Sequence, residues 1–392
     1  MTSLPAFRVL RLPTFVLLAS LATSGFHVMG KEPETIRIAT YNVSLYGKEA
    51  GEIRQRLSDA NDSQARKIAA IIQIVRPDVL LVNELDYEPD QGPARLLAEN
   101  YFARPQQAVG SGEPLLPLEY PYVYSAPSNT GIDSSMDLNL DGQTGTGDDA
   151  WGYGVYPGQY AMTVFSRFPI DHAAIRTFQT FLWKDFPGAI RPIDPKTDRP
   201  FHPDAVWNSL RLSSKNHIDV PIQVGDAKLH VLGSHPTPPV FDGPEDRNGA
   251  RNHDEVEFWS RYLTDENDQW IIDDRGRRGG YSNGEPFVIM GDLNADPVSG
   301  SGRREAIQRL LGLSVVKAVS PKTSDASVAD ALRDKTADWR NGRMRVDYVI
   351  PSERMHVADS GVFWPADSEP GSKLVDASDH RLVWVDAVLT PN

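Results

Sequence analysis

Short apolar segments recur along this chain, and several of them end in a polar residue. Such runs are typical of β-strands, whereas apolar residues spaced three and four apart indicate an amphipathic helix. The sequence therefore predicts strands at 35–43, 78–82, 160–165, 206–212, 217–224, 228–233, 287–290, 345–350 and 382–388. It predicts helices at 65–75, 92–100, 252–263 and 305–311, with mostly loop between 103 and 158. This order indicates an α/β fold of two packed sheets with helices on the outside.

The polar strand ends are the candidate functional positions, because such folds build their sites where strands end. They are Asn42 in TYNV, Glu84 in VNEL, His235 in GSHP, Asp292 and Asn294 in GDLNADP, Asp347 in RVDYVI, and Asp379 and His380 in ASDH. Each one alone has an ordinary explanation as a turn residue, a helix cap or an ion-pair partner. Their repetition at strand after strand is better explained by one shared site.

The chemistry of this set is that of a metal-dependent hydrolytic centre. Carboxylate and amide oxygens are the ligands that Mg²⁺, Mn²⁺ and Ca²⁺ prefer. Histidines transfer protons or stabilise negative charge, and a neighbouring carboxylate holds an imidazole in one tautomer. Attack of water on a phosphate ester needs a metal, a base and donors for the transition state.

The order of these motifs resembles the endonuclease/exonuclease/phosphatase superfamily, which has the DNase I-like fold, from residue 35 to the end. The most specific elements are GDLNADP and the later SDH, which follow the NE strand end. The resemblance implies a four-layered α/β/β/α sandwich of two mixed sheets and hydrolysis of a phosphomonoester or phosphodiester. It also implies a metal such as Mg²⁺ or Mn²⁺, held by Glu84 with Asn42 and Asp379 nearby.

The resemblance further implies a catalytic role for each remaining strand-end residue. Asp292, helped by Asn294, would activate or orient the attacking water. His235 and His380 would stabilise the phosphoryl oxygens, and Asp347 would orient His380.

Two stretches depart from the family pattern and bear on the substrate. Relatives that cut nucleic acid often carry Arg or Tyr where this chain has Gln159 followed by Tyr160; the uncharged Gln159 can donate to a phosphate but weighs against DNA. The polar loop after His235 contains Arg247 and Arg251, which we expect to hold an anionic part of the substrate near a helix N-terminus. The alternative is that both arginines pair with acidic residues of the same loop.

The insert at 133–150 begins like a calcium-binding loop, with Asp137, Asn139 and Asp141 at alternate positions. The twelfth position of that pattern is Asp148 in place of Glu, and no flanking helix is predicted. A Ca²⁺ site and an ordinary Asp/Gly turn are therefore both compatible with the stretch.

Residues 1–30 have the pattern of a secretory signal peptide, with arginines before a short apolar run and small residues after it. An uncleaved N-terminal anchor is the alternative. Residues 31–392 are expected to form one domain, and no stable membrane span is expected because no second long apolar run occurs. The chain has no cysteine, which excludes disulfides and thiolate sites and fits a secreted or periplasmic protein.

The net charge of −13 is unlike that of a general binder of duplex DNA. It favours a small or lipid-derived phosphoester over nucleic acid as the substrate. An acidic extracellular nuclease is the alternative within the class, and a catalytically silent binding protein is the alternative outside it. The presence of Glu84 and both strand-end histidines argues against a silent protein. No feature indicates an obligate protein partner.

Overall fold

The computed structural model describes residues 35–107, 113–282, 284–340 and 342–389. The predicted signal segment, residues 1–30, lies outside them. Within these residues, no helix has both the length and the apolar character needed to cross a bilayer.

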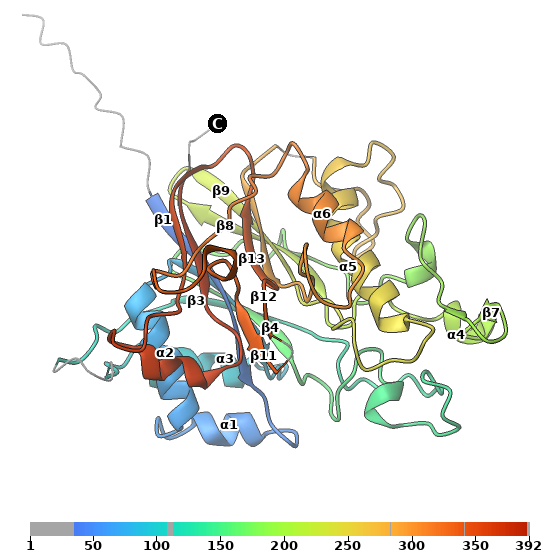
Figure 1. The fold of residues 1–392 in the computed structure, drawn as a ribbon, viewed down its shortest axis with the longest axis horizontal. Coiled ribbons are helices and arrows are strands. Elements are labelled where there is room, and N and C mark those ends of the chain that lie inside the picture. Colours follow the sequence, from blue (N-terminus) through green and yellow to red (C-terminus); the bar gives the residue numbers. More distant parts are fainter. Residues whose placement is uncertain (1–34, 108–112, 283, 341, 390–392) are drawn as a thin grey trace, which may run out of the picture. The chain divides into compact units, whose positions relative to one another are not determined.

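Two mixed sheets form the centre of the fold (Figure 1). The first contains, in spatial order, β14 (His356–Val362), β15 (Val383–Val388), β1 (Thr35–Leu45), β2 (Val79–Leu85), β4 (Ala161–Ser166) and β3 (Tyr122–Ala126). The second contains β13 (Asp347–Pro351), β10 (Phe287–Asp292), β9 (Ala227–Ser234), β8 (His217–Val224) and β5 (Arg176–Thr177). The pairs β1–β2 and β9–β10 are parallel, and the other neighbours are antiparallel.

The helices and two small ribbons surround these sheets. The α-helices are α1 (Glu52–Leu57), α2 (Ser63–Val75), α3 (Gly92–Leu97), α4 (Asp204–Trp207), α5 (Arg247–Thr264) and α6 (Glu305–Leu311). The π-helix is η1 (Ala98–Phe102), and the 3₁₀ turns are η2 (Gly147–Asp149), η3 (Trp183–Asp185), η4 (Asp330–Leu332) and η5 (Ser372–Ala377). The ribbons pair β6 (Ile193–Asp194) with β7 (Arg199–Pro200) and β11 (Ala337–Trp339) with β12 (Gly342–Met344).

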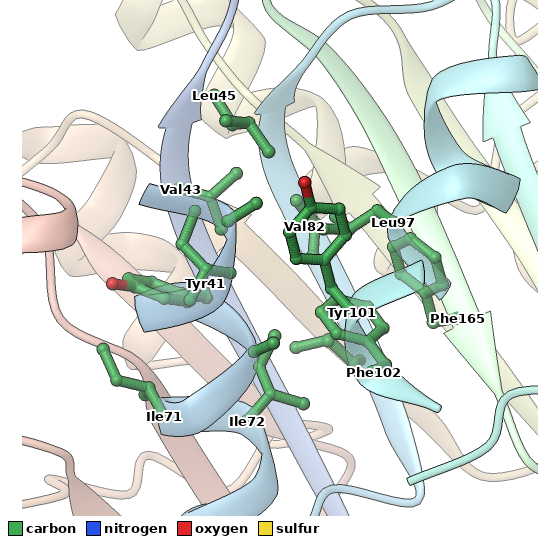
Figure 2. Close-up of a cluster of buried hydrophobic side chains, with 14 of the residues drawn as sticks. Tyr41, Val43, Leu45, Ile71, Ile72, Val82, Leu97, Tyr101, Phe102 and Phe165 are labelled. Carbon is green, nitrogen blue, oxygen red and sulfur yellow. The ribbon is translucent and has the colours of Figure 1, made fainter. Parts of the chain in front are cut away.

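Strand alternation divides the apolar side chains among three layers of core, because neighbouring residues of a strand point to opposite faces. On β1, Tyr41 and Val43 pack against Ile71 and Ile72 of α2 and against Phe165 (Figure 2). This cluster lies between the first sheet and helices α1 to α3.

The opposite face of the first sheet packs on the second sheet. Ile38 and Leu81 belong to the same buried cluster as Met290 and Val349. Ile289, the neighbour of Met290 on β10, points to the outer face of the second sheet, where it packs with residues of α5 and α6. The order helices, sheet, sheet, helices confirms the expected four-layered α/β/β/α sandwich.

The helix predicted at 65–75 is confirmed as α2, and Asp62 caps it by accepting the Ala65 N–H at 2.8 Å. The strand predicted at 206–212 is wrong. The chain there forms α4 and a turn, because Trp207, Leu210 and Leu212 all pack into the cluster beneath α5. Strands β3 and β14 were not expected: the first lies in a stretch rich in turn residues, and the second is a polar edge strand.

Helix α5 begins at Arg247, earlier than the predicted 252. Asn252, where the predicted helix would begin, is therefore inside the helix and does not cap it. Asn252 is buried in the second turn and donates to the Thr237 and Leu293 carbonyls at 2.9 and 3.0 Å. The first turn is bonded instead by Asp242, which accepts the Asn248 N–H at 2.7 Å.

Candidate active site

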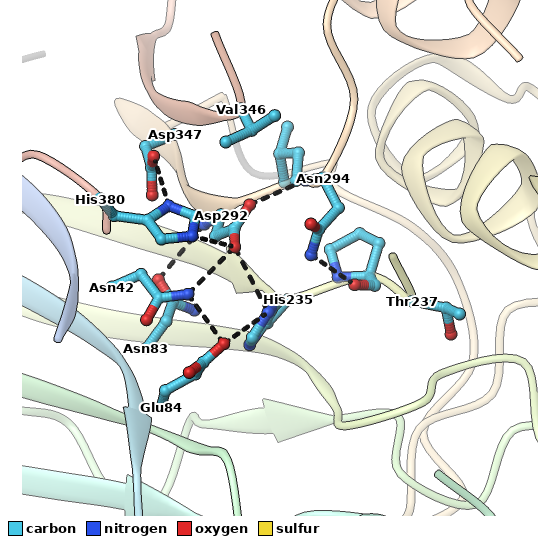
Figure 3. Close-up of polar contacts among 12 residues, drawn as sticks. Asn42, Asn83, Glu84, His235, Thr237, Asp292, Asn294, Val346, Asp347 and His380 are labelled. Carbon is cyan, nitrogen blue, oxygen red and sulfur yellow. Dashed lines mark hydrogen bonds and ion pairs between the residues drawn. The ribbon is translucent and has the colours of Figure 1, made fainter. Parts of the chain in front are cut away.

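The predicted strand-end residues meet where the two sheets come together. Register pairs Asn42 of β1 with Asn83 of β2, and Asp292 of β10 with Asp347 of β13. Asn83 joins the two sheets, because its Oδ1 accepts the Asp292 N–H at 3.2 Å (Figure 3). Glu84, the next residue, thus lies at the same edge as Asp292.

Asp292 is the centre of the cluster. Its Oδ2 accepts from Asn42 Nδ2 at 3.1 Å and lies 3.5 Å from Nε2 of His235 and 3.7 Å from Nε2 of His380. Its Oδ1 accepts the Asn294 N–H at 2.9 Å. Burial raises the pKa of Asp292 to about 7, although nearby His380 opposes this shift. A buried carboxylate is thereby brought into reach of two imidazoles.

The two histidines differ in their surroundings. His380 Nδ1 lies 2.9 Å from Asp347 Oδ2, so this carboxylate sets the orientation of the ring. Burial opposes the charged form, but Asp347 and Asp292 outweigh it and raise the pKa of His380 to about 10. For His235, burial and the nearby positive charge of Lys215 lower the pKa well below its usual range. The site therefore contains one charged and one neutral imidazole at neutral pH.

Two of these strand-end residues have a left-handed backbone. Glu84 and Asn294 have φ of 60° and 49°, in the left-handed region that residues with a side chain seldom adopt. Near the end of β10, Gly291 cannot be replaced because the backbone of β9 is too close: a Cβ at this position would lie 2.0 Å from the Ser234 carbonyl oxygen. This geometry directs Glu84 and Asp292 toward one another.

The residues present fit a divalent cation. Glu84, His235 and Asp292 each offer a donor atom, and these atoms lie within 4.8 Å of one another. Burial raises the pKa of Glu84, and the only hydrogen bond given to its carboxylate within the described chain comes from Asn42 at 3.0 Å. Its Oε1 also lies 3.9 Å from Nε2 of His235, so both groups can bind one cation. A second group of the same kind is formed by Asp292, Asp347 and His380.

Two predicted metal positions have other partners. The Asn42 oxygen accepts the Ser44 N–H at 3.1 Å, so this amide positions the two carboxylates that its nitrogen contacts. Asp379 accepts from Ser44 Oγ at 3.0 Å and from Trp339 Nε1 at 2.8 Å. It lines the cavity but belongs to neither donor group.

A cavity of about 870 Å³ opens from Glu84, His235 and Asp379. One wall is aromatic: the ring centroids of Tyr46 and Tyr160 are 4.5 Å apart, and Tyr153 stacks on Tyr160 at 6.5 Å. At the mouth, Phe241 is 88% exposed and adopts a φ of 66°. The cavity is thus acidic at the end formed by Glu84 and Asp379 and aromatic along its side.

The structure separates the predicted substrate-binding residues. Tyr160 lines the cavity, but Gln159 is buried: its amide donates to the Gly47 carbonyl and accepts the Val155 N–H, both at 2.9 Å. Gln159 therefore holds the turn that presents Tyr160 and is not placed to donate to a substrate.

The two loop arginines both line the cavity. Arg247 pairs with Glu245, which is the alternative left open by the sequence. Arg251 uses Nε and Nη2 to bind the main-chain carbonyls of Leu212 and Trp151 at 3.0 and 2.6 Å, along with others nearby. Its main contacts are thus with the scaffold.

The acidic insert forms a tight turn. Asp137 accepts the Asp141 and Gly142 N–H groups at 3.2 and 2.9 Å, and Asn139 contacts Asp141. Asp148 instead lines the cavity, and no contact joins it to these residues in the described segment. The Ca²⁺ interpretation stays a prediction for the first three residues.

The sequence offered no signal for several residues that complete the site. Asn83 is buried, and its Nδ2 has no partner among the described residues. Trp339 packs edge-on against His380, with ring centroids 5.3 Å apart. Lys215 lines the cavity, and Glu255 bonds to Ser214, which also lines it.

An α/β/β/α sandwich with carboxylates and histidines clustered at its strand ends is the fold of a class of phosphoester hydrolases. Residues 39–380 match the model of the Endonuclease/Exonuclease/phosphatase family, and the chain belongs to that family. Its members are generally phosphoester hydrolases and typically depend on divalent metals.

Other comparisons give distant likenesses. No curated protein matches the sequence. The chain is similar to an endonuclease/exonuclease/phosphatase from Beutenbergia cavernae, with 19% identity, 91% of this chain and 72% of that chain covered, and a TM-score of 0.47. It is similar to an endonuclease/exonuclease/phosphatase family protein from Leptotrichia buccalis, with 15% identity, 89% of this chain and 98% of that chain covered, and a TM-score of 0.47. It is also similar to sphingomyelinase C from Streptomyces griseocarneus, with 16% identity, 90% of this chain and 99% of that chain covered, and a TM-score of 0.43.

Proposed function

We propose that this protein is a secreted, divalent-metal-dependent phosphoester hydrolase whose substrate is a small or lipid-derived phosphomonoester or phosphodiester. The observation that carries this proposal is the arrangement around Asp292. Its buried carboxylate faces two histidines, one charged and one neutral, beside a second carboxylate, that of Glu84. A binding protein without catalysis has no need of this combination.

Asp292 has the properties of the general base. Its pKa of about 7 lies close to a neutral working pH, where proton transfer by a base is most effective. Asn42 and the Asn294 N–H each hold one of its oxygens, so the carboxylate has a defined orientation toward an attacking water. This supports activation of the water by Asp292 with the help of Asn294.

His380 and His235 would stabilise the phosphoryl oxygens. Asp347 keeps His380 charged and oriented, so its Nε2–H can donate to an oxygen that gains negative charge. His235 offers a neutral donor from the opposite side of Asp292. A divalent cation held by Glu84 would, when bound, neutralise part of the charge on the reacting phosphate, which leaves His235 and Asp292 for the roles above.

The cavity supports a small or lipid-derived substrate over duplex DNA. It has a volume of about 870 Å³ and is walled by Tyr46, Tyr153 and Tyr160. Val240 and Phe241 are 40% and 88% exposed at its mouth. Exposed apolar groups beside a site mark contact with an apolar partner, such as the tail of a lipid phosphoester.

The test is a hydrolysis panel with Mg²⁺, Mn²⁺ or Ca²⁺. Its substrates are sphingomyelin, phosphoinositides, p-nitrophenyl phosphate, bis-p-nitrophenyl phosphate, plasmid DNA and RNA. We expect a lipid-derived or small phosphoester to be hydrolysed fastest, and we expect exhaustive EDTA treatment to abolish the reaction. Glu84→Gln should lower the rate and weaken the metal dependence while the fold stays intact. Activity that survives EDTA would overturn the metal role, and preference for DNA would make the protein a nuclease.

Secretion rests on residues 1–30. We expect protein recovered from the culture medium or periplasm to begin near residue 31, as read by N-terminal mass spectrometry. An intact residue 1 in cytoplasmic protein would refute export.

A further inference from the structure

One buried cation beside the site has no partner. Lys215 lies between α4 and β8, two residues before His217, and is only 6% exposed. In the described chain its ammonium has neither a hydrogen bond nor an ion pair, and it lines the cavity. Lys335 shows the usual arrangement, since this equally buried lysine pairs with Asp296 at 3.1 Å. The ammonium of Lys215 is reached from the cavity, so an anion there can supply the partner that the protein does not.

The charges around Lys215 are those of the active site. Burial lowers its pKa, while Glu255, Glu84 and Asp292 act in the opposite direction. In turn, its positive charge helps lower the pKa of His235. The geometry agrees, because Lys215 lines the same cavity as Glu84 and His235.

The backbone that carries this lysine is held from several directions. Glu255 accepts from the Ser214 N–H and Oγ at 2.6 and 2.9 Å, and the Lys215 carbonyl accepts the Asn129 N–H at 2.9 Å. The insert packs so closely that a Cβ on Gly152 would lie 1.7 Å from the Ser214 carbonyl oxygen. Such fixed placement of an unpaired charge is typical of a preorganised electrostatic site.

We propose that the Lys215 ammonium binds a non-bridging oxygen of the substrate's reacting phosphate. The missing partner has to be an anion that enters through the cavity and reaches the catalytic carboxylates. A phosphate fits, because Glu84, Asp292, Asp347 and Asp379 would repel it without a compensating cation nearby. This inference rests on the proposed function and adds a residue for substrate binding that the strand-end motifs do not contain.

The first test measures binding without turnover. Protein freed of metal with EDTA is titrated with inorganic phosphate, and affinity is read by calorimetry and by the thermal shift. Lys215→Met should weaken phosphate binding by about tenfold or more, as for loss of a hydrogen bond to a charged group. Its melting temperature should equal or exceed that of the wild type, because a costly unpaired charge has been removed.

The matched control is Lys228→Met, which removes a positive charge at the far end of β9, where Lys228 lies 3.4 Å from Asp171. It should bind phosphate like the wild type. Unchanged phosphate affinity in Lys215→Met would overturn the proposal, as would a lowered melting temperature or a wild type that binds no phosphate.

Hydrolysis separates this inference from the proposed function. Lys215→Met should reduce kcat/KM by about 10²–10³-fold, the usual effect of losing a donor that stabilises developing charge. If the wild type is active and this variant is equally active, the lysine role fails and the function stands. If no panel substrate is hydrolysed but phosphate binding still depends on Lys215, the function fails and the anion site stands.

Discussion

Glu255 offers the sharpest test of how the fold supports the site. It lies on α5, is fully buried, and its carboxylate accepts three hydrogen bonds. Oε1 accepts from the Ser214 N–H and Oγ at 2.6 and 2.9 Å, and Oε2 accepts the Thr237 N–H at 2.6 Å. One side chain thus joins the turn that carries Lys215 to the segment that follows His235.

Glu255→Gln keeps the shape but leaves a single acceptor oxygen. In either amide orientation the NH₂ group faces a main-chain N–H, that of Ser214 or that of Thr237. A buried donor without a partner costs about 1–3 kcal/mol, and a lost bond to a charged group costs a similar amount. We therefore expect the free energy of unfolding to fall by about 3 kcal/mol. Turnover should fall as well, by about 10²-fold, if the two segments shift by about 1 Å.

The assay is urea unfolding followed by circular dichroism, with kcat measured on the best panel substrate. Glu257→Gln is the matched control on the same helix. The Oε1 of Glu257 accepts from Arg261 and Arg309, while Oε2 has no partner, so an amide can replace it without a clash. Because Arg309 is half exposed, this control should lose less than about 1 kcal/mol. Equal losses in the two variants, or an undisturbed Glu255→Gln, would refute the reasoning.

Three further predictions follow from the same structure. His380→Ala and His235→Ala should each lower turnover by on the order of 10²-fold while phosphate binding changes far less; a variant with wild-type rates on every substrate would show that its histidine is structural. Ca²⁺ should raise the melting temperature of the wild type more than that of Asp137→Ala/Asp141→Ala, and equal shifts would place the ion elsewhere. Burial lowers the pKa of His202 to about 4, so below its unfolded pKa the unfolded chain binds a proton that the folded chain does not, and stability falls as the pH drops. Between about pH 7 and about pH 4.5 the wild type should lose roughly 2 kcal/mol more than His202→Gln in urea unfolding, and parallel losses would contradict this assignment.

Much of the fold and the centre of the site could be predicted from local pattern. The run 35–43 alternates apolar and other residues and the run 287–290 is short and wholly apolar, and both patterns predict strands. A polar residue at the end of such a strand needs a polar partner, which a shared site provides. Asn42, Glu84 and Asp292 were predicted on this basis, and the structure brings them together with both histidines. The same reasoning failed at 206–212. The apolar residues of this segment belong to a short helix and a turn that pack on one cluster, and their spacing resembles that of a strand.

Residue types alone did not decide the role of Gln159. A glutamine before a strand can face a ligand or bind the main chain equally well. Only the position of Gly47, which lies 112 positions away in the sequence, shows that this amide is already used. Arg247 was ambiguous for the same reason until its pairing with Glu245 was seen.

The sequence by itself determined most of the strands and helices, the family and the strand-end residues, because each of these depends on neighbours within a few positions. The tertiary structure alone decided what surrounds those residues. Asn83 bonds to Asp292 across 209 positions, and Ser214 bonds to Glu255 across 41. Lys215 stands out only once its burial and its lack of a partner are known. Such contacts depend on which segments pack together. The free energy of that packing comes from the whole core, so no local sequence pattern reveals it.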